Sequence, residues 1–159
     1  MGSRWAEPAR LFLPGGALLA VTLATARPAA AQRVVELGLI AIGTAADPAV
    51  LVGGGWAGLR TSSRTRVSAT LAAGGSDGAF AWRGELLGHF LLSPTRPRGV
   101  GLYGAGGVAV AGGPVDQGYL VLTFGLEDRP GGRRGWFVEA GIGGGARLAA
   151  GYRWRRGTG

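Results

Sequence analysis

The 159-residue sequence lacks cysteine, lysine and asparagine, and it contains a single histidine, His89. Without cysteine the chain forms no disulfide, no thiolate-ligated metal centre and no thiol nucleophile. Without lysine it forms no Schiff base, and one imidazole does not suffice for a histidine-based metal cage. We therefore expect neither a metal nor a cofactor, and we expect no thiol- or lysine-based catalysis.

Apolar runs long enough to cross a membrane as a helix are also absent. Residues 11–26 are apolar, follow Arg4 and Arg10, and precede the small residues Ala29 and Ala31. They fall short of the about 20 residues that a membrane-spanning helix needs. A positive start, a short apolar stretch and an A-x-A site are typical of a secretory signal peptide. We predict a signal peptide over 1–31, cleaved after Ala31, and a single domain over 32–159.

Glycine is abundant, with 33 residues, while a hydrophobic content of 47% argues against disorder. Glycine costs a helix about 1 kcal/mol per residue. The region after residue 32 divides into short segments separated by Gly, Pro, Asp and Ser turns, which is typical of an all-β meander. We predict an all-β fold, an eight-stranded antiparallel up-and-down barrel that spans a membrane. The predicted strands are 33–43, 49–60, 64–73, 79–92, 99–110, 117–126, 134–143 and 146–155.

Most of these segments alternate apolar and polar residues, which a strand places on opposite faces. Aromatic residues cluster near the strand ends on the apolar face, as they do at membrane interfaces. We therefore predict that the apolar face meets lipid and that both signs of charge lie in the lumen. The predicted lumen charges are Glu36, Arg66, Arg83, Glu85, His89, Glu139, Arg147 and Arg153. The predicted aromatic girdles are Phe80 and Trp82 at one rim and, at the other, Phe90, Phe124, Trp136, Tyr152 and Trp154.

The interior of an eight-stranded barrel is just wide enough for side chains to fill. We expect glycines at lumen positions to relieve crowding, and a lumen plugged by charged side chains. A narrow water path past these glycines is the alternative. The glycines expected in the lumen are Gly38, Gly53, Gly101, Gly107 and Gly141.

With its signal peptide, alternating strands and aromatic girdles, the chain resembles the small eight-stranded outer-membrane β-barrel family of OmpA- and OmpX-type architecture. The last strand, Gly151-Tyr152-Arg153-Trp154, resembles the C-terminal assembly signal of that family, although residues 155–159 follow the aromatic here. The resemblance implies a monomer in the outer membrane of a Gram-negative-type bacterium. Its partners would be outer-membrane lipid and, during biogenesis, the barrel-assembly machinery; its role would be structural or envelope-associated rather than enzymatic.

Two alternatives remain open at this point. A soluble periplasmic or secreted barrel of the lipocalin type would turn the same apolar face inward to bind an apolar ligand. A lipid A-modifying enzyme would need a Ser-His-Glu set on the lipid-facing wall. Strand parity places His89 in the lumen instead, where Glu85 is its expected partner.

Other motifs in the sequence carry little weight. Gly-x-Gly-x-x-Gly occurs at 53–58 and 99–104, but no helix follows to hold a pyrophosphate. Gly-x-Ser-x-Gly at 74–78 lies between two predicted strands and is better explained by an Asp77-Gly78 turn. The formal charge of +8 suggests nucleic acid, yet no helix is predicted that would enter a groove, so we expect no nucleic-acid partner.

Overall fold

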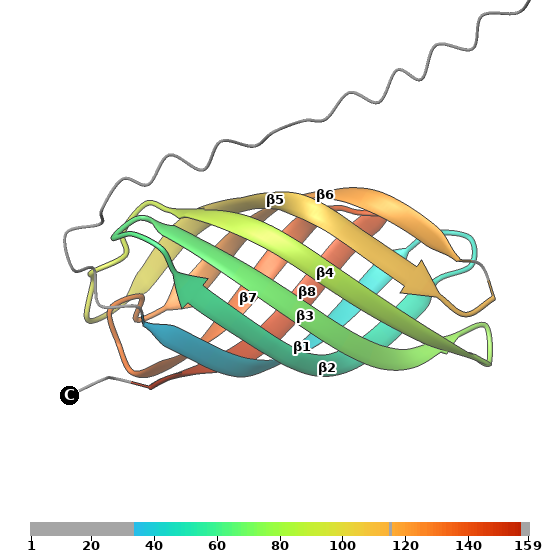
Figure 1. Ribbon diagram of the computed structural model, residues 1–159, viewed down its shortest axis with the longest axis horizontal. Coiled ribbons are helices and arrows are strands. Elements are labelled where there is room, and N and C mark those ends of the chain that lie inside the picture. Colours follow the sequence, from blue (N-terminus) through green and yellow to red (C-terminus); the bar gives the residue numbers. More distant parts are fainter. Residues whose placement is uncertain (1–33, 115, 157–159) are drawn as a thin grey trace, which may run out of the picture.

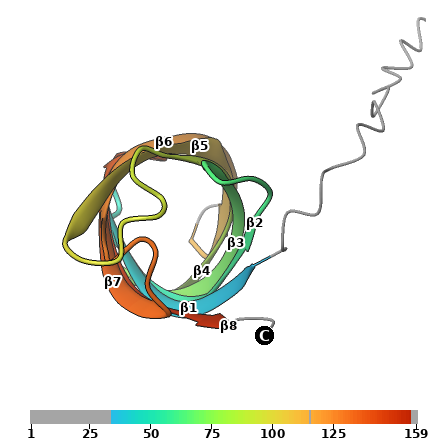
Figure 2. The ribbon, with the colours of Figure 1, turned by 90° about the vertical axis from the view of Figure 1, so that its left-hand side faces the viewer.

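The structure, a computed structural model, describes residues 34–114 and 116–156, which form one closed antiparallel barrel (Figures 1 and 2). Each strand pairs with its neighbours in sequence, and β1 pairs with β8 to close the cylinder. The predicted signal peptide lies outside the described residues. The strands are β1 (Val35–Ala45), β2 (Val50–Arg60), β3 (Thr65–Ser76), β4 (Ala79–Leu91), β5 (Val100–Gly112), β6 (Gln117–Asp128), β7 (Arg134–Ile142) and β8 (Ala146–Arg156).

The hydrogen-bond register makes the strands oblique to the barrel axis. A path that starts at Val35 and steps through paired residues returns to β1 at Ala45 rather than at its starting point. A stagger of about ten residues over eight strands corresponds to a tilt of about 40°. Strands of 11 to 13 residues, the usual length here, then reach about 25–30 Å along the axis. The intermediate partners on that path are Leu59, Val67, Gly88, Gly106, Leu122, Ile142 and Ala146.

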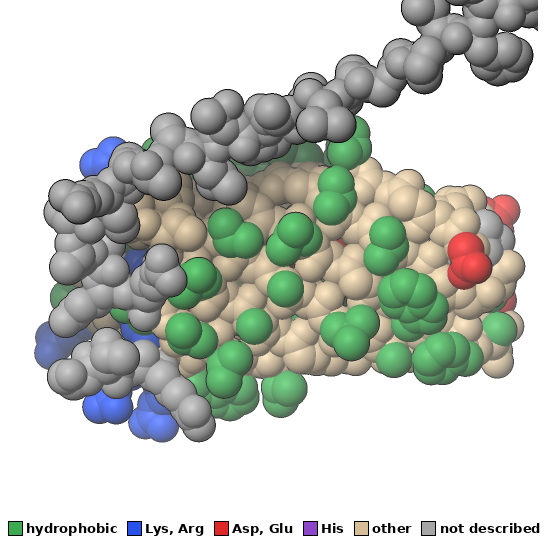
Figure 3. All heavy atoms as spheres, in the orientation of Figure 1, with side chains coloured by type: hydrophobic (Ala, Val, Ile, Leu, Met, Phe, Trp, Pro, Cys, Tyr) green, Lys and Arg blue, Asp and Glu red, His purple; other side chains and the backbone are tan. Residues whose placement is uncertain are grey.

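Side chains alternate between the interior and the outer wall along the strands. In β3, Arg66, Ser68, Thr70 and Ala72 are buried, whereas Leu71 on the other face is 68% exposed. Large apolar side chains cover the outer wall, and the space-filling view shows them spread over the middle of the cylinder (Figure 3). The barrel is therefore apolar outside and polar inside.

The connections lie at two ends that differ in construction. At one end the described connecting residues are 46–49, 77–78, 113–114, 116 and 143–145. At the other end they are 61–64, 92–99 and 129–133, and β1 begins and β8 ends there. Asp77 and Gly78 both have positive φ, 49° and 79°, and close the β3–β4 hairpin as predicted. No helix in the described part of the chain is long and apolar enough to cross a membrane.

The expected lumen position of one glycine was wrong. Gly53 lies on the outer wall, and its neighbour Gly54 points inward. A Cβ on Gly54 would overlap the Leu71 carbonyl oxygen and the Ala72 Cα of β3, whereas a Cβ on Gly55 would meet nothing within 4 Å. The run of three glycines hides the alternation of β2 in the sequence, and only the inward-pointing member needs to lack a side chain. The predicted strand bounds otherwise differ from the observed ones by three residues at most.

Candidate functional site

All eight of the charged or titratable residues predicted to share the lumen lie inside the barrel. Each is at most 4% exposed, and each comes from an inward-facing strand position. They form two clusters along the axis. The arginine-end cluster lies near the chain ends, and the far cluster lies toward the opposite mouth.

Glu36 of β1 is the centre of the arginine-end cluster and is fully buried. Its Oε1 accepts hydrogen bonds from Arg60 Nε at 3.0 Å and from Arg155 Nη2 at 2.6 Å. Its Oε2 accepts from Arg66 Nη1 at 3.1 Å, and Arg153 Nη1 lies 3.7 Å from Oε1. The Glu36 carboxylate thus forms ion pairs with four guanidinium groups, which come from β2, β3 and β8.

Glu127, the last inward residue of β6, completes this cluster and lies one residue beyond the predicted strand 117–126. Its Oε2 accepts from Arg66 Nη1 at 2.9 Å and lies 3.4 Å from Arg153 Nε. The alternation of β6 runs through Val121, Thr123 and Gly125 and places residue 127 inside, so this parity, continued two residues further, would have found it. Two carboxylates here face four arginines, which leaves an excess of positive charge.

Carbonyl oxygens of two turns take up part of that excess. Arg60 Nη2 and Arg155 Nη2 both donate to the Pro130 carbonyl, at 2.8 and 2.7 Å. Arg153 Nη2 donates to the carbonyl of Arg129 at 3.0 Å, and Arg60 Nη1 to that of Pro94 at 3.2 Å. The lumen arginines therefore hold the 92–99 and 129–133 turns across the mouth, where Figure 2 shows both turns crossing the ring of strands.

Pro130 of the 129–133 turn is buried at this end of the barrel. It is one of the largest fully buried side chains, and it packs against Gly101 of β5, where a Cβ would overlap the proline Cγ. Gly101, one of the predicted lumen glycines, thus leaves the space that the Pro130 ring occupies. Charged side chains and the two turns thus contact one another at this mouth.

The far cluster is balanced in charge. Arg147 binds Glu85 through two hydrogen bonds, from Nε at 3.0 Å and from Nη2 at 2.8 Å, and also donates to Glu139 at 2.8 Å. Arg83 donates from Nε to the same Glu85 at 2.7 Å and from Nη2 to the carbonyl of Gly143 at 2.9 Å. Two arginines and two glutamates satisfy one another here, as a buried ionic network requires.

Aromatic side chains join the two clusters, and sequence reasoning did not place them in the lumen. The Arg66 guanidinium lies 5.2 Å from the ring centroids of both Trp56 and Tyr103. Tyr103 also donates to Glu139 at 2.9 Å, so it connects the arginine-end cluster to the far cluster. Phe137 packs on Trp56 with ring centroids 5.5 Å apart. These three rings are buried in the lumen together with the charged side chains.

His89 does not pair with Glu85, and that expectation was wrong. Its Nδ1 lies 3.3 Å from Arg66 Nη2, and its Nε2 lies 2.7 Å from Ser68 Oγ. A guanidinium only donates, so Nδ1 accepts, and the proton of the neutral ring sits on Nε2, from which it is donated to Ser68. A histidine that donates to the hydroxyl is not placed to remove its proton, and the pair is therefore not an activated nucleophile.

The opposite mouth remains partly open. A cavity of about 120 Å³ there is lined by Thr44, Ser76, Arg83 and Tyr119 among others. The Arg83 guanidinium carbon lies over the Tyr119 ring, 5.8 Å from its centroid. Within residues 34–114 and 116–156 no group of His, Asp and Glu side chains could hold a metal ion.

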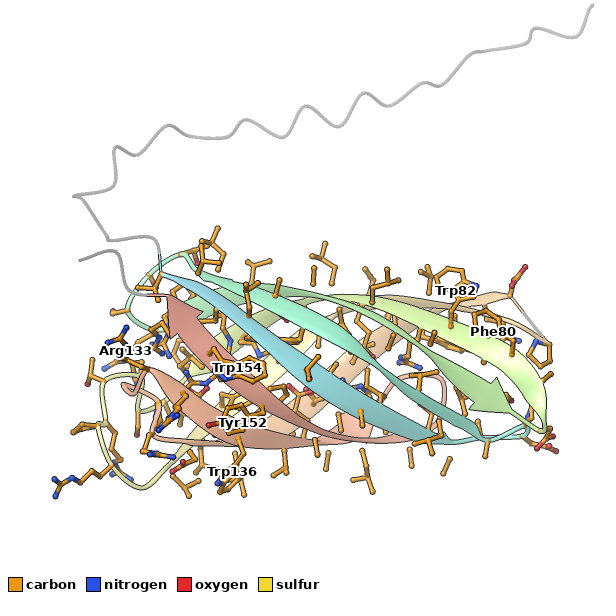
Figure 4. The ribbon with its side chains drawn as sticks, turned by 90° about the horizontal axis from the view of Figure 1, so that it is seen from below. Phe80, Trp82, Arg133, Trp136, Tyr152 and Trp154 are labelled. Carbon is orange, nitrogen blue, oxygen red and sulfur yellow. The ribbon has the colours of Figure 1, made fainter. Side chains whose placement is uncertain are left out.

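The outer wall carries the residues predicted as aromatic girdles. Phe80 and Trp82 lie near one end of the cylinder, and Trp136, Tyr152 and Trp154 lie toward the other, the end at which Arg133 lies (Figure 4). Tyr152 and Trp154 pack edge to face with centroids 5.1 Å apart. Phe90 is also near a strand end, while Phe124 lies farther inside the wall and is 72% exposed. All seven are on the outer face, and their contact with a membrane interface stays a prediction.

Comparison with known proteins identifies the fold. No family model and no curated protein matches the chain. The crystal structure of the N-terminal β-barrel domain of Pseudomonas aeruginosa OprF matches with a TM-score of 0.56 at 14% identity, covering 75% of this chain and 97% of that one. The solution structure of the de novo designed protein TMB2.3 matches with a TM-score of 0.55 at 18% identity, covering 79% and 96%. The chain has the fold of a small eight-stranded transmembrane barrel, and the resemblance inferred from its sequence is confirmed at that level.

Replacing the central carboxylate tests the lumen network. Glu36→Gln leaves four arginines, two of them fully buried, facing Glu127 alone, and breaking a buried ionic contact on one side typically costs about 3–5 kcal/mol. We expect the free energy of unfolding, measured by urea titration in detergent micelles, to fall by about that amount. Asp77→Asn removes a carboxylate from an exposed turn and should change it by less than about 0.5 kcal/mol. Equal effects of the two substitutions would contradict a network centred on Glu36.

Proposed function

We propose that this protein is a monomeric outer-membrane β-barrel of a Gram-negative-type bacterium, with a structural or envelope-associated role and a lumen plugged by charged side chains. In this proposal it is exported by a signal peptide over 1–31 and inserted by the barrel-assembly machinery. Its outer wall, including the seven girdle aromatics, contacts outer-membrane lipid. It has no enzymatic activity and binds neither cofactor nor nucleic acid.

The observation that carries the proposal is the exposure of the outer wall. Leu120 is 82% exposed, Phe124 72%, and Leu51 and Leu71 68% each, and large apolar side chains of all eight strands lie on this surface. Monomeric soluble proteins rarely expose contiguous apolar patches beyond a few hundred Å². A wall of this kind suits acyl chains, and alternation of lipid-facing apolar with inward polar residues is the pattern of membrane barrels.

The interior argues against a soluble barrel that binds an apolar ligand. Such a barrel needs an apolar cavity, whereas arginines and glutamates occupy this lumen, and the aromatic rings between them pack on one another and on Arg66. The likeness to the OprF barrel domain agrees with the membrane assignment.

The geometry also favours a non-enzymatic monomer. Ser68 and His89 lie in the lumen rather than on the lipid-facing wall, and the histidine donates to the hydroxyl. This arrangement supports no deacylation of lipid A. Every strand has a paired neighbour on both sides, so the closed barrel has no edge strand to which a second chain would add.

An arginine on the wall distinguishes a membrane barrel from a soluble one. Leu71 lies in the middle of β3, and Leu71→Arg should lower the free energy of unfolding in vesicles by about 2–4 kcal/mol because the charge enters the bilayer midplane. Leu92, also exposed, lies just beyond the end of β4, and Leu92→Arg should cost at most about 1 kcal/mol near the interface. Urea titration of both variants in lipid vesicles measures this difference. A soluble barrel would tolerate both substitutions equally.

The plugged lumen predicts an electrically silent protein. Side chains and the folded 129–133 turn fill the arginine end, so reconstitution into planar bilayers should give no stepwise current. The folded state of the same preparation is checked by heat-modifiable migration on a gel, so that silence is not mistaken for unfolding. Discrete, reproducible conductance steps from the folded protein would contradict the plug and favour the narrow water path.

A further inference from the structure

The two ends of the barrel carry opposite exposed charge. Asp47, Asp77 and Asp116 are exposed in the turns of one end, where no exposed arginine is described. The space-filling view shows acidic side chains at that end and basic ones at the other (Figure 3). The exposed arginines of the basic end form what we call the arginine collar: Arg64, Arg96, Arg98, Arg129, Arg133 and Arg134.

The collar lies at the edge of the apolar wall. Arg134, the first residue of β7, follows the same alternation as the outward-facing Trp136, and its register partner on β8 is Trp154. Arg133 precedes it, and Figure 4 shows Arg133 beyond Trp154 and Tyr152 at the end of the cylinder. Arginine next to tryptophan just beyond an apolar band is the arrangement of side chains at a membrane interface.

Most of the collar has no acidic partner. Among the described residues Arg129 pairs with Asp128, at 2.7 Å, whereas Arg98, Arg133 and Arg134 form no ion pair. The lumen beneath also holds more arginine than glutamate, which adds to the positive potential of this end. A guanidinium matches the geometry of a phosphate through paired hydrogen bonds and is weakly hydrated, so it binds phosphate well.

We propose that the arginine collar binds the phosphate groups of anionic phospholipids in the leaflet at this end of the barrel. This inference rests on the proposed function, because it requires the wall to be in a bilayer. The acidic turns at the other end repel such headgroups. The charge difference between the two ends therefore favours the orientation in which the collar lies in the leaflet that contains the anionic phospholipid.

Lipid fits the collar better than a soluble anionic polymer does. Arg134 points outward from the wall beside the girdle tryptophans, where a headgroup lies directly against it. The negative surface of anionic lipid attracts each nearby arginine, and the attraction falls off within a Debye length.

Quenching of tryptophan by brominated lipid tests the proposal directly. The protein is refolded into phosphatidylcholine vesicles that contain an equal small fraction of either brominated phosphatidylglycerol or brominated phosphatidylcholine. Trp136 and Trp154 beside the collar should be quenched at least about twofold more strongly by the brominated anionic lipid, and about 0.5 M salt should reduce the preference. The Arg98→Gln, Arg133→Gln, Arg134→Gln triple variant should show equal quenching by the two lipids.

The matched control removes three charges from the opposite end. The Asp47→Asn, Asp77→Asn, Asp116→Asn variant should keep the preference of the wild-type protein. Equal quenching by both lipids in the wild-type protein would overturn the collar proposal while leaving the membrane barrel intact. Absence of quenching by either lipid would instead overturn the proposed function. The collar proposal would also be overturned if the aspartate variant lost the preference. Collar-dependent binding of soluble dextran sulfate without a lipid preference would overturn the collar proposal as well.

Discussion

The narrow interior of an eight-stranded cylinder is the constraint on which the rest of this molecule depends. It has room for side chains but for little water, so every charge placed there must find a partner on another strand. Glu36 meets this requirement by contacting arginines of β2, β3 and β8, and Glu85 by joining β4 to β8 through Arg147. The ionic contacts therefore connect strands that are far apart in sequence. The charged residues of the strands occupy inward-facing positions, and apolar residues occupy the outward-facing positions of the wall.

The excess of arginine over glutamate at one end explains a further part of the architecture. Arginines that share Glu36 and Glu127 use their remaining N–H groups to bind the carbonyls of Pro94, Arg129 and Pro130, and in doing so they hold two turns over the mouth. The charge-balanced far cluster makes one such contact, from Arg83 to the Gly143 carbonyl, and the mouth above it keeps a cavity. At one end the lumen arginines thus hold two turns over the mouth, and the same end carries the exposed arginines. The two ends of the barrel therefore differ both in the charge balance of the lumen and in the sign of their exposed charge.

Strand parity predicted a large part of this arrangement, because a period of two is a local property of the sequence. It placed His89 and Arg147 inside and Trp82 outside without any knowledge of their partners. It did not predict that His89 contacts Ser68 and Arg66, since partners across strands follow from the register, which hairpin lengths alone do not determine. Trp56 was missed because the glycines before it conceal the alternation of β2. Glu127 was missed because a Glu-Asp pair before Arg-Pro-Gly has the composition of a turn.

In the proposed arrangement, the outward-facing leucines contact lipid and the charged side chains lie in the lumen, the opposite of a soluble barrel. Because the sequence lacks cysteine, a single introduced cysteine can be spin-labelled without background. Labels at Leu71→Cys, Leu86→Cys and Leu122→Cys in lipid vesicles should collide freely with oxygen and hardly at all with a water-soluble nickel complex, while a label at Asp77→Cys should show the reverse. If the three wall positions were as accessible to the nickel complex as the turn, the wall would face water and the account would be wrong.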